Sequence, residues 1–206
     1  MRITRHLLTA TLLACAANAV AASSTDLNVH GLITPSACVP EISNGGEADF
    51  GKLAAKDLRV DRFTRLDSHY LQMKVTCEAQ TFIALQGHDN RAGSAYREEE
   101  GNFGLGLING DERLGSFWVV LTSAIADGVP ARFIESIDGG TTWFSGGSLW
   151  RDSTASVANT TTLAPIPVKV LSGEMDLRAF IAPTNTLTLT EEVPIDGSVT
   201  VTVVYL

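Results

Sequence analysis

The chain reads as a series of short segments in which apolar and polar residues alternate. A period of two places apolar side chains on one face of a β-strand and polar side chains on the other. No segment keeps the period of an amphipathic helix over three turns, although residues 122–128 could form a brief helix. Turn-forming residues separate the segments, with a turn expected at Ser172-Gly173, so the pattern predicts an all-β antiparallel sandwich. The expected strands cover residues 23–33, 48–53, 69–78, 82–85, 103–108, 117–122, 165–171, 176–181, 187–189 and 198–206.

The last expected strand, residues 198–206, is the most apolar of the series. One face carries Val199, Val201, Val203 and Tyr205, and the other carries Thr200, Thr202, Val204 and Leu206. β-branched residues of this kind suit a pleated, half-buried surface. Chain termini fray unless they dock, so we expect this strand to pair within a sheet. By contrast, the Ser- and Thr-rich residues 153–162 are expected to form a loop.

The N-terminus has the organisation of a secretory signal peptide. Arg2 and Arg5 precede a short apolar run over residues 7–15, which is too short to span a bilayer. The small residues at 19–21 match a cleavage site, so a mature chain is expected to start at Ala22. Residues 12–15 also resemble a bacterial lipobox, in which Cys15 would carry the lipid. The sequence therefore predicts export, with a lipoprotein as the alternative.

Charge and cysteine content narrow the class of protein further. Removal of residues 1–21 takes away two arginines and no acidic residue, which changes the formal charge from −8 to −10. No basic patch stands out, so nucleic-acid binding is not expected. Cys38 and Cys77 remain after cleavage, and two cysteines in an exported chain most simply form one disulfide. No third cysteine or histidine stands at ligand spacing, so no metal site is expected.

The sequence carries no catalytic signature. There is no G-x-S-x-G elbow, H-E-x-x-H, P-loop or dinucleotide fingerprint, so we expect neither an enzyme nor a cofactor. Residues 136–143 match the Ser-x-Asp-x-Gly-x-Thr-Trp pattern of an Asp-box, which predicts a hairpin corner. Trp143, Phe144 and Trp150 follow closely. They either cover a small core or form a candidate surface for stacking carbohydrate.

Several motifs, taken in order, resemble the pilin subunits of bacterial chaperone–usher fimbriae. They are Gly31-x-Ile33-x-Pro35-x-x-Cys38, Asp49-Phe50-Gly51, Val75-x-Cys77 and the penultimate Tyr205. The chain is also similar, over essentially its whole mature length, to a group of uncharacterised fimbrial-subunit-like proteins. The marks of that group are Ile33-Thr34-Pro35, Phe50-Gly51-Lys52-Leu53, residues 89–94 (DNRAGS) and residues 104–108 (GLGLI).

The pilin resemblance implies an immunoglobulin-like sandwich that lacks its last strand. A periplasmic chaperone would lend a strand, and the outer-membrane usher would exchange it for the N-terminal extension of a neighbouring subunit. The implied domains are a signal peptide (1–21), a candidate donor strand (22–31) and a pilin-like domain (32–206). Leu27, Val29 and Gly31 are the implied donor residues. The implied edge that binds chaperone or subunit carries Val199, Val201, Val203, Tyr205 and Leu206.

Three functions stay open at this stage. The first is a structural subunit of a fimbria at the cell surface. The second is a fimbrial adhesin or exported carbohydrate-binding module that uses residues 143–150. The third, an exported glycosidase, would need paired carboxylates in a cleft. For the donor strand, the alternative is that Leu27 and Val29 complete the protein's own sheet.

Overall fold

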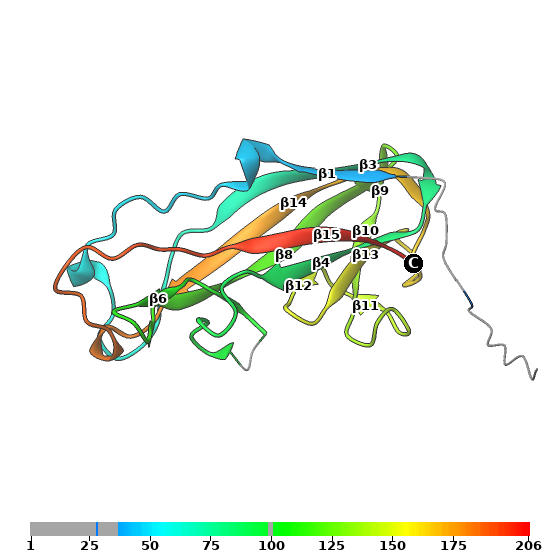
Figure 1. Cartoon of the computed structure of the whole chain (residues 1–206). Helices are drawn as coiled ribbons and strands as arrows, with labels where there is room; N and C mark the ends of the chain where they lie inside the picture. The colour runs from blue at the N-terminus through cyan, green and yellow to red at the C-terminus, as the bar shows by residue number, and fades with distance from the viewer. Residues whose placement is uncertain (1–27, 29–36, 99–100) are drawn as a thin grey trace, which may run out of the picture. The chain divides into compact units, whose positions relative to one another are not determined.

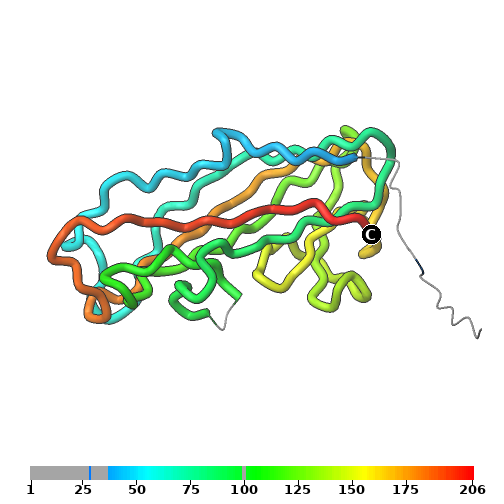
Figure 2. Tube along the Cα trace, in the orientation of Figure 1, coloured from blue at the N-terminus to red at the C-terminus, as the bar shows by residue number. Residues whose placement is uncertain are grey.

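Two antiparallel β-sheets pack face to face in this computed structural model, with the core between them (Figures 1 and 2). The structure describes residue 28, residues 37–98 and residues 101–206. The described residues from 37 onward belong to one unit. Since every paired strand of the two sheets is antiparallel, the all-β sandwich expected from the alternating pattern is confirmed.

The first sheet has the strand order β1-β3-β14-β8-β12, and the second has the order β11-β10-β13-β4-β15. The main strands of the first sheet are β1 (Cys38–Ile42), β3 (His69–Thr81), β14 (Val168–Ile181), β8 (Gly115–Ala126) and β12 (Ser148–Leu149). Short strands β2 (Thr64–Arg65), β5 (Phe103–Gly104) and β9 (Val129–Pro130) pair beside them. The second sheet consists of β11 (Phe144–Ser145), β10 (Arg132–Ser136), β13 (Thr154–Ala158), β4 (Ile83–Asp89) and β15 (Val199–Tyr205).

The remaining elements are short. A two-stranded ribbon joins β6 (Leu107–Ile108) to β7 (Glu112–Arg113). Single 3₁₀ turns are η1 (Ser43–Gly46), η2 (Ala55–Asp57) and η4 (Thr184–Thr186). Within the described residues, no helix is long and apolar enough to cross a membrane.

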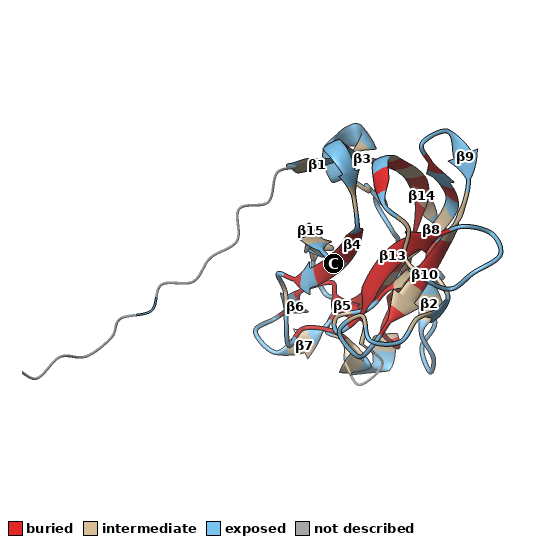
Figure 3. Ribbon diagram, turned by 90° about the vertical axis from the view of Figure 1, so that its right-hand side faces the viewer, coloured by how far each residue is buried: buried red, intermediate tan, exposed pale blue. Residues whose placement is uncertain are grey.

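The core lies between the sheets and follows the period-two pattern. In β3, Leu71, Met73, Val75 and Cys77 are buried, and the residues between them are exposed. Phe117, Val119 and Leu121 of β8 and Leu85 of β4 belong to the same cluster of buried side chains. Figure 3 shows the burial concentrated in β14, β8, β13 and β4, the inner strands of the two sheets.

Three expectations about individual strands are wrong. Residues 165–171 and 176–181 belong to a single strand, β14, because Ser172 and Gly173 continue it instead of forming a turn. A side chain at Gly173 would collide with the ring of buried Phe133, so this position needs glycine for packing, not for a turn. Residues 122–126 extend β8 and are not helical.

Two further predictions about loops and strands are also wrong. The segment expected to be a Ser- and Thr-rich loop contains β13, whose five residues are all buried. Ser156 fits that environment because its hydroxyl donates to the backbone oxygen of Ile83 at 2.7 Å. Conversely, residues 48–53 and 187–189, which were expected to be strands, pair with no other strand in the described structure. Both unpaired segments contribute residues to the lining of one apolar groove.

Candidate functional site

β15 is an edge strand whose inward-facing valines are only half buried. Its register with β4 places Val199, Val201 and Val203 opposite Asp89, Gly87 and Leu85. Residues opposite each other in an antiparallel pair point to the same side of a sheet. Leu85 is 1% exposed, yet its partner Val203 is only partly buried, as are Val199 and Val201. Among the described strands, β15 pairs only with β4, so its other edge has no strand partner there and its valines are only partly buried.

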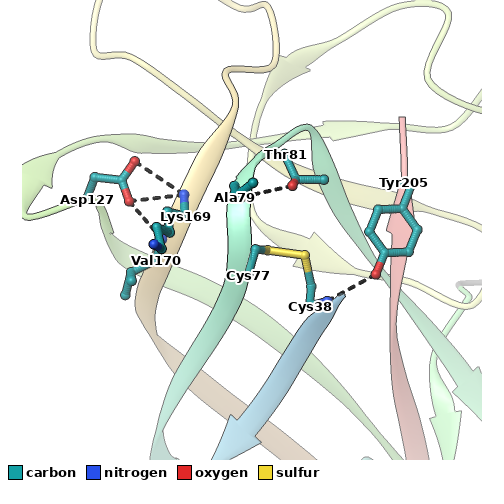
Figure 4. The surroundings of a disulfide bond; sticks show 8 residues. All are labelled: Cys38, Cys77, Ala79, Thr81, Asp127, Lys169, Val170 and Tyr205. Carbon is teal, nitrogen blue, oxygen red and sulfur yellow. Dashed lines mark hydrogen bonds between the residues drawn. A yellow bond between two sulfur atoms is a disulfide. The ribbon is translucent and has the colours of Figure 1, made fainter. Parts of the chain in front are cut away.

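β1 forms the corresponding edge of the first sheet and lies near β15. Within the described residues it pairs only with β3, in a register that sets Cys38 directly opposite Cys77. The disulfide between these two cysteines is present, as the sequence predicts. The backbone N–H of Cys38 donates to the hydroxyl of Tyr205 at 3.1 Å (Figure 4). This hydrogen bond joins the two sheet edges at the last residue of β15.

At the other end of β15, the two edges are continued by irregular segments that enclose an apolar groove of about 650 Å³. One wall consists of residues from 46–58, including Phe50, Leu53 and Leu58. The other wall consists of residues from 189–199. Its apolar members are Leu189, Val193, Pro194, Ile195 and Val199. The floor is made of core residues, namely Leu105, Leu114, Phe117, Leu177 and Ile181. Core side chains thus border the groove along this side of the sandwich.

The first wall takes its shape from the Asp-Phe-Gly motif. The carboxylate of Asp49 accepts the backbone N–H of Gly51 at 2.8 Å, and Gly51 has a φ of 63°, a conformation that favours glycine. Between them, Phe50 packs edge-on against the ring of His69, with the ring centroids 4.5 Å apart. The turn therefore directs the aromatic ring toward the sheet.

The second wall is fastened to the ribbon β6–β7 and to the segment before β5. Glu112 accepts the backbone N–H of Thr188 at 2.6 Å and its hydroxyl at 2.7 Å. These bonds, with one from Asn109, lower the pKa of Glu112. Further along, Arg91 donates two hydrogen bonds to Asp196, which lower the pKa of that carboxyl. The wall is held in place although it belongs to no sheet.

The DNRAGS motif over residues 89–94 explains how Arg91 reaches Asp196. Asp89 is buried, and its carboxylate accepts the N–H groups of Arg91 at 2.8 Å and of Gly104 at 3.0 Å. Ser94 accepts the N–H of Gly106 at 3.1 Å. A side chain at Gly104 would overlap the Ser94 hydroxyl, which ties the two motifs of this region together. Both motifs are therefore parts of the scaffold that positions the second wall.

One exposed ion pair crosses the mouth of the groove. Lys52 of the first wall lies 3.2 Å from Glu192 of the second, and their side chains are 87% and 81% exposed. An ion pair this exposed contributes little to stability. The mouth is therefore bridged only weakly, whereas the Tyr205 end is joined by a hydrogen bond beside the disulfide.

The expected donor residues cannot be placed. Leu27, Val29 and Gly31 lie outside the described residues, as does Cys15. The role assigned to them stays a prediction. Val199, Val201, Val203 and Tyr205 are found on one face of an edge strand, as the alternation predicts, and Leu206 follows the strand. Their role in binding a partner also stays a prediction.

The Asp-box motif forms the turn between β10 and β11, so the predicted hairpin corner is present. Asp138 accepts the backbone N–H of Thr142 at 2.9 Å and its hydroxyl at 2.6 Å, and the hydroxyl of Ser136 bonds the same carboxylate. The bonds from Thr142, and then that from Ser136, lower the pKa of Asp138 to about 2. The polar side chains of the motif thus form their hydrogen bonds within the turn itself.

The three aromatic residues near this corner lie in different surroundings. Trp143 lies against Gly140 within the turn, Phe144 is exposed in β11, and Trp150 packs on Gly101. No ring-to-ring contact joins them within the described part of the chain. The carbohydrate surface expected there stays a prediction. In the same part of the chain, no group of three His, Cys, Asp or Glu side chains could hold a metal ion.

The fold and the groove define a class: a disulfide-linked β-sandwich whose two sheets leave one side open. Residues 27–117 match a family model described as a protein of unknown function (DUF1120). Two proteins of Escherichia coli (strain K12) align with 93% of the chain. "Uncharacterized protein YhcF" is 27% identical over 226 residues, covering 94% of that protein. "Protein GltF" is 25% identical over 246 residues, covering 95%.

These comparisons support similarity to an uncharacterised family. The family match spans the first wall of the groove, β3, β4 and the motifs at 89–94 and 104–108. The narrower resemblance to chaperone–usher pilins is not carried by these matches.

The sequence pattern missed most of the groove. One wall contains a segment without strand pairing, to which Leu189, Val193 and Ile195 belong. The one sequence feature that connects this segment with β15 is Ile195, which lies two residues before Gly197. A side chain at Gly197 would meet Leu105 and Phe117, both part of the groove floor. This close approach appears only in three dimensions.

Proposed function

We propose that this chain is a structural subunit of a chaperone–usher fimbria, exported through the periplasm and polymerised at the cell surface by donor-strand complementation. The observation that carries the proposal is the incomplete burial of Val199, Val201 and Val203. These valines face the core from an edge strand, and the groove beside Val199 reaches core side chains. An exposed apolar strand edge of this kind can pair with a strand from another chain.

The occupant in this proposal is the segment of residues 22–31 from a neighbouring copy. An added strand gains backbone hydrogen bonds from the edge, and alternate side chains fill pockets. Leu27 and Val29 have the period-two spacing that this binding mode requires. Before assembly, a periplasmic chaperone would cover the same edge, and the outer-membrane usher would mediate the exchange.

The unpaired edges of β1 and β15 support an inserted strand. Tyr205 joins these edges at one end, and the groove opens near Val199 at the other. Lys52 and Glu192 would separate readily, because their exposed pair is weak. We therefore expect entry from the groove and a fixed stop near the disulfide.

The test compares the mature chain with a variant lacking residues 22–30, each expressed without a chaperone. We expect the full mature chain to form oligomers on size-exclusion chromatography and the shortened chain to be insoluble or unstable. The matched control is the Leu27→Asp/Val29→Asp double variant, which keeps the chain length but removes the apolar side chains. If full-length and shortened chains are both stable, soluble monomers, donor-strand complementation is wrong for this protein.

A further inference from the structure

A second hollow, lined by none of the groove residues, lies between η2 and β2. Its volume is about 640 Å³, and it is open to solvent, because every residue that lines it except Thr64 is exposed. The residues that line it are Asp57, Arg59, Arg62, Phe63, Thr64 and Arg65. Three arginines thus line one hollow in a chain whose formal charge is −8.

These arginines are not engaged in ion pairs. Within the described part of the chain, no carboxylate lies within 4.0 Å of the guanidinium nitrogens of Arg59, Arg62 or Arg65. Elsewhere in the same part, Arg91, Arg113, Arg151 and Arg178 are all paired with acidic residues. Asp57 is the single acidic residue on the lining, so the hollow keeps an excess of positive charge.

The backbone that carries the arginines is fixed from several directions. The carbonyl of Arg59 accepts the N–H of Thr184 at 3.0 Å, and the N–H of Arg59 donates to the Thr64 hydroxyl at 2.8 Å. The carbonyl of Val60 accepts the N–H of Asn185 at 3.2 Å. Arg65 lies in β2, paired with Phe180 of β14. A loop held in this way loses little backbone freedom on binding.

An aromatic ring lies among the charges. Phe63 is 39% exposed, and it packs on buried Phe180 with the ring centroids 5.3 Å apart. Phe180 in turn contacts Trp118, and the guanidinium of Arg65 lies 6.0 Å from the Trp118 ring. The aromatic cluster therefore supports both an exposed ring and one of the three guanidinium groups.

We propose that this hollow binds an acidic saccharide, with Arg59, Arg62 and Arg65 holding its carboxylate or sulfate and Phe63 stacking on a sugar ring. Guanidinium groups bind such anions through paired, charge-assisted hydrogen bonds. The exposed ring supplies an apolar contact that a bare anion cannot use. The acidic surface of the whole chain disfavours nucleic acid and anionic membranes, because both carry extended negative charge. A short acidic saccharide needs only the local positive charge.

The test is isothermal titration calorimetry on the full mature chain with four probes. They are trigalacturonate for carboxylates, a κ-carrageenan tetrasaccharide for sulfates, maltotriose as a neutral sugar, and inorganic sulfate as a bare anion. We expect one or both acidic saccharides to bind at least about tenfold more tightly than maltotriose and inorganic sulfate. The stronger of the two identifies the preferred anion.

Single-residue variants test whether the acidic saccharide binds in this hollow. Arg62→Gln is expected to weaken the acidic saccharide about tenfold, and Phe63→Leu to weaken it less. Lys74→Gln removes the same charge from an exposed position of β3 and is expected to leave affinity unchanged. Circular dichroism melts show whether each variant folds, and the separate single variants keep the test usable if one does not. Equal loss in Arg62→Gln and Lys74→Gln, equal binding of maltotriose or inorganic sulfate, or no binding of either acidic saccharide would overturn the proposal.

Discussion

Tyr205 has a structural task that its place near the chain end does not reveal. Its hydroxyl accepts the N–H of Cys38 and so connects edge strands of different sheets. Tyr205→Phe keeps the ring but leaves the N–H without this acceptor. We expect a loss of about 1 kcal/mol in the free energy of unfolding, measured by urea denaturation. Tyr70→Phe, at an exposed site, is the control. Equal effects in both variants would contradict the assigned role.

Asp138 gives the hairpin corner a dependence on pH. Its pKa is about 2 in the folded chain, against an ordinary value of 3.8. Because the folded pKa is depressed, the carboxylate's contribution to stability is fully present above about pH 4 and is lost as pH falls through about 2. The amide of Thr142 should therefore lose hydrogen-exchange protection between about pH 4 and pH 2. In Asp138→Asn this protection should already be weaker at neutral pH and should no longer follow that titration. An unchanged profile in the variant would exclude the carboxylate as the cause.

At the scale of elements, β1 depends on its cross-link. It is a five-residue edge strand whose one strand partner in the described part of the chain is β3, and the disulfide lies at its first residue. The two cysteines are 39 residues apart, and closing a loop of this length stabilises by about 4 kcal/mol in the chain-entropy model. Cys38→Ala/Cys77→Ala should lose about that free energy of unfolding in urea denaturation. The reduced wild-type chain should behave like the double variant. No difference between oxidised and reduced chains would refute this estimate.

Periodicity predicts elements well where only one face of a strand is buried. β3 and β15 show this, since their polar residues alternate with apolar ones and point to solvent. The same signal fails for β13, because both faces of that central strand are buried and small polar residues such as Ser156 are accommodated by hydrogen bonds. The turn predicted at Gly173 is wrong for a different reason. A glycine is needed within this long strand because a side chain there would collide with the Phe133 ring.

Only the part of the candidate site formed by β15 and the disulfide could be predicted from the sequence. The alternation over 198–206 identified the apolar face of β15, and the cysteine count identified the cross-link beside it. The walls of the groove, by contrast, are irregular segments held by side-chain bonds such as Glu112 to Thr188, which have no period to detect. The arginines of the second hollow were also missed, because Asp57 and Asp61 are interspersed with them in the sequence.

For the molecule as a whole, the open groove implies that occupancy and stability are linked. A ligand that binds only the folded chain raises the free energy of unfolding by about 2.7 kcal/mol at one hundred times its dissociation constant. We expect a peptide of residues 22–31 to do so when added to the Leu27→Asp/Val29→Asp chain, whose own segment cannot compete. Denaturant titration with and without the peptide measures the gain.

Hydrogen exchange then tells where the peptide binds. An inserted strand should protect amides of β1 and β15 that bond neither β3 nor β4, because the free edges of these strands would become paired. Protection should spread from Val199 toward Tyr205 if the strand enters at the groove and stops at the hydrogen bond to Cys38. A control peptide with Asp at both apolar positions should neither stabilise nor protect, since it offers no side chains for the groove. Equal stabilisation by both peptides, or protection confined to other strands, would mean that the groove is not a strand acceptor and that its half-buried valines serve the monomer alone.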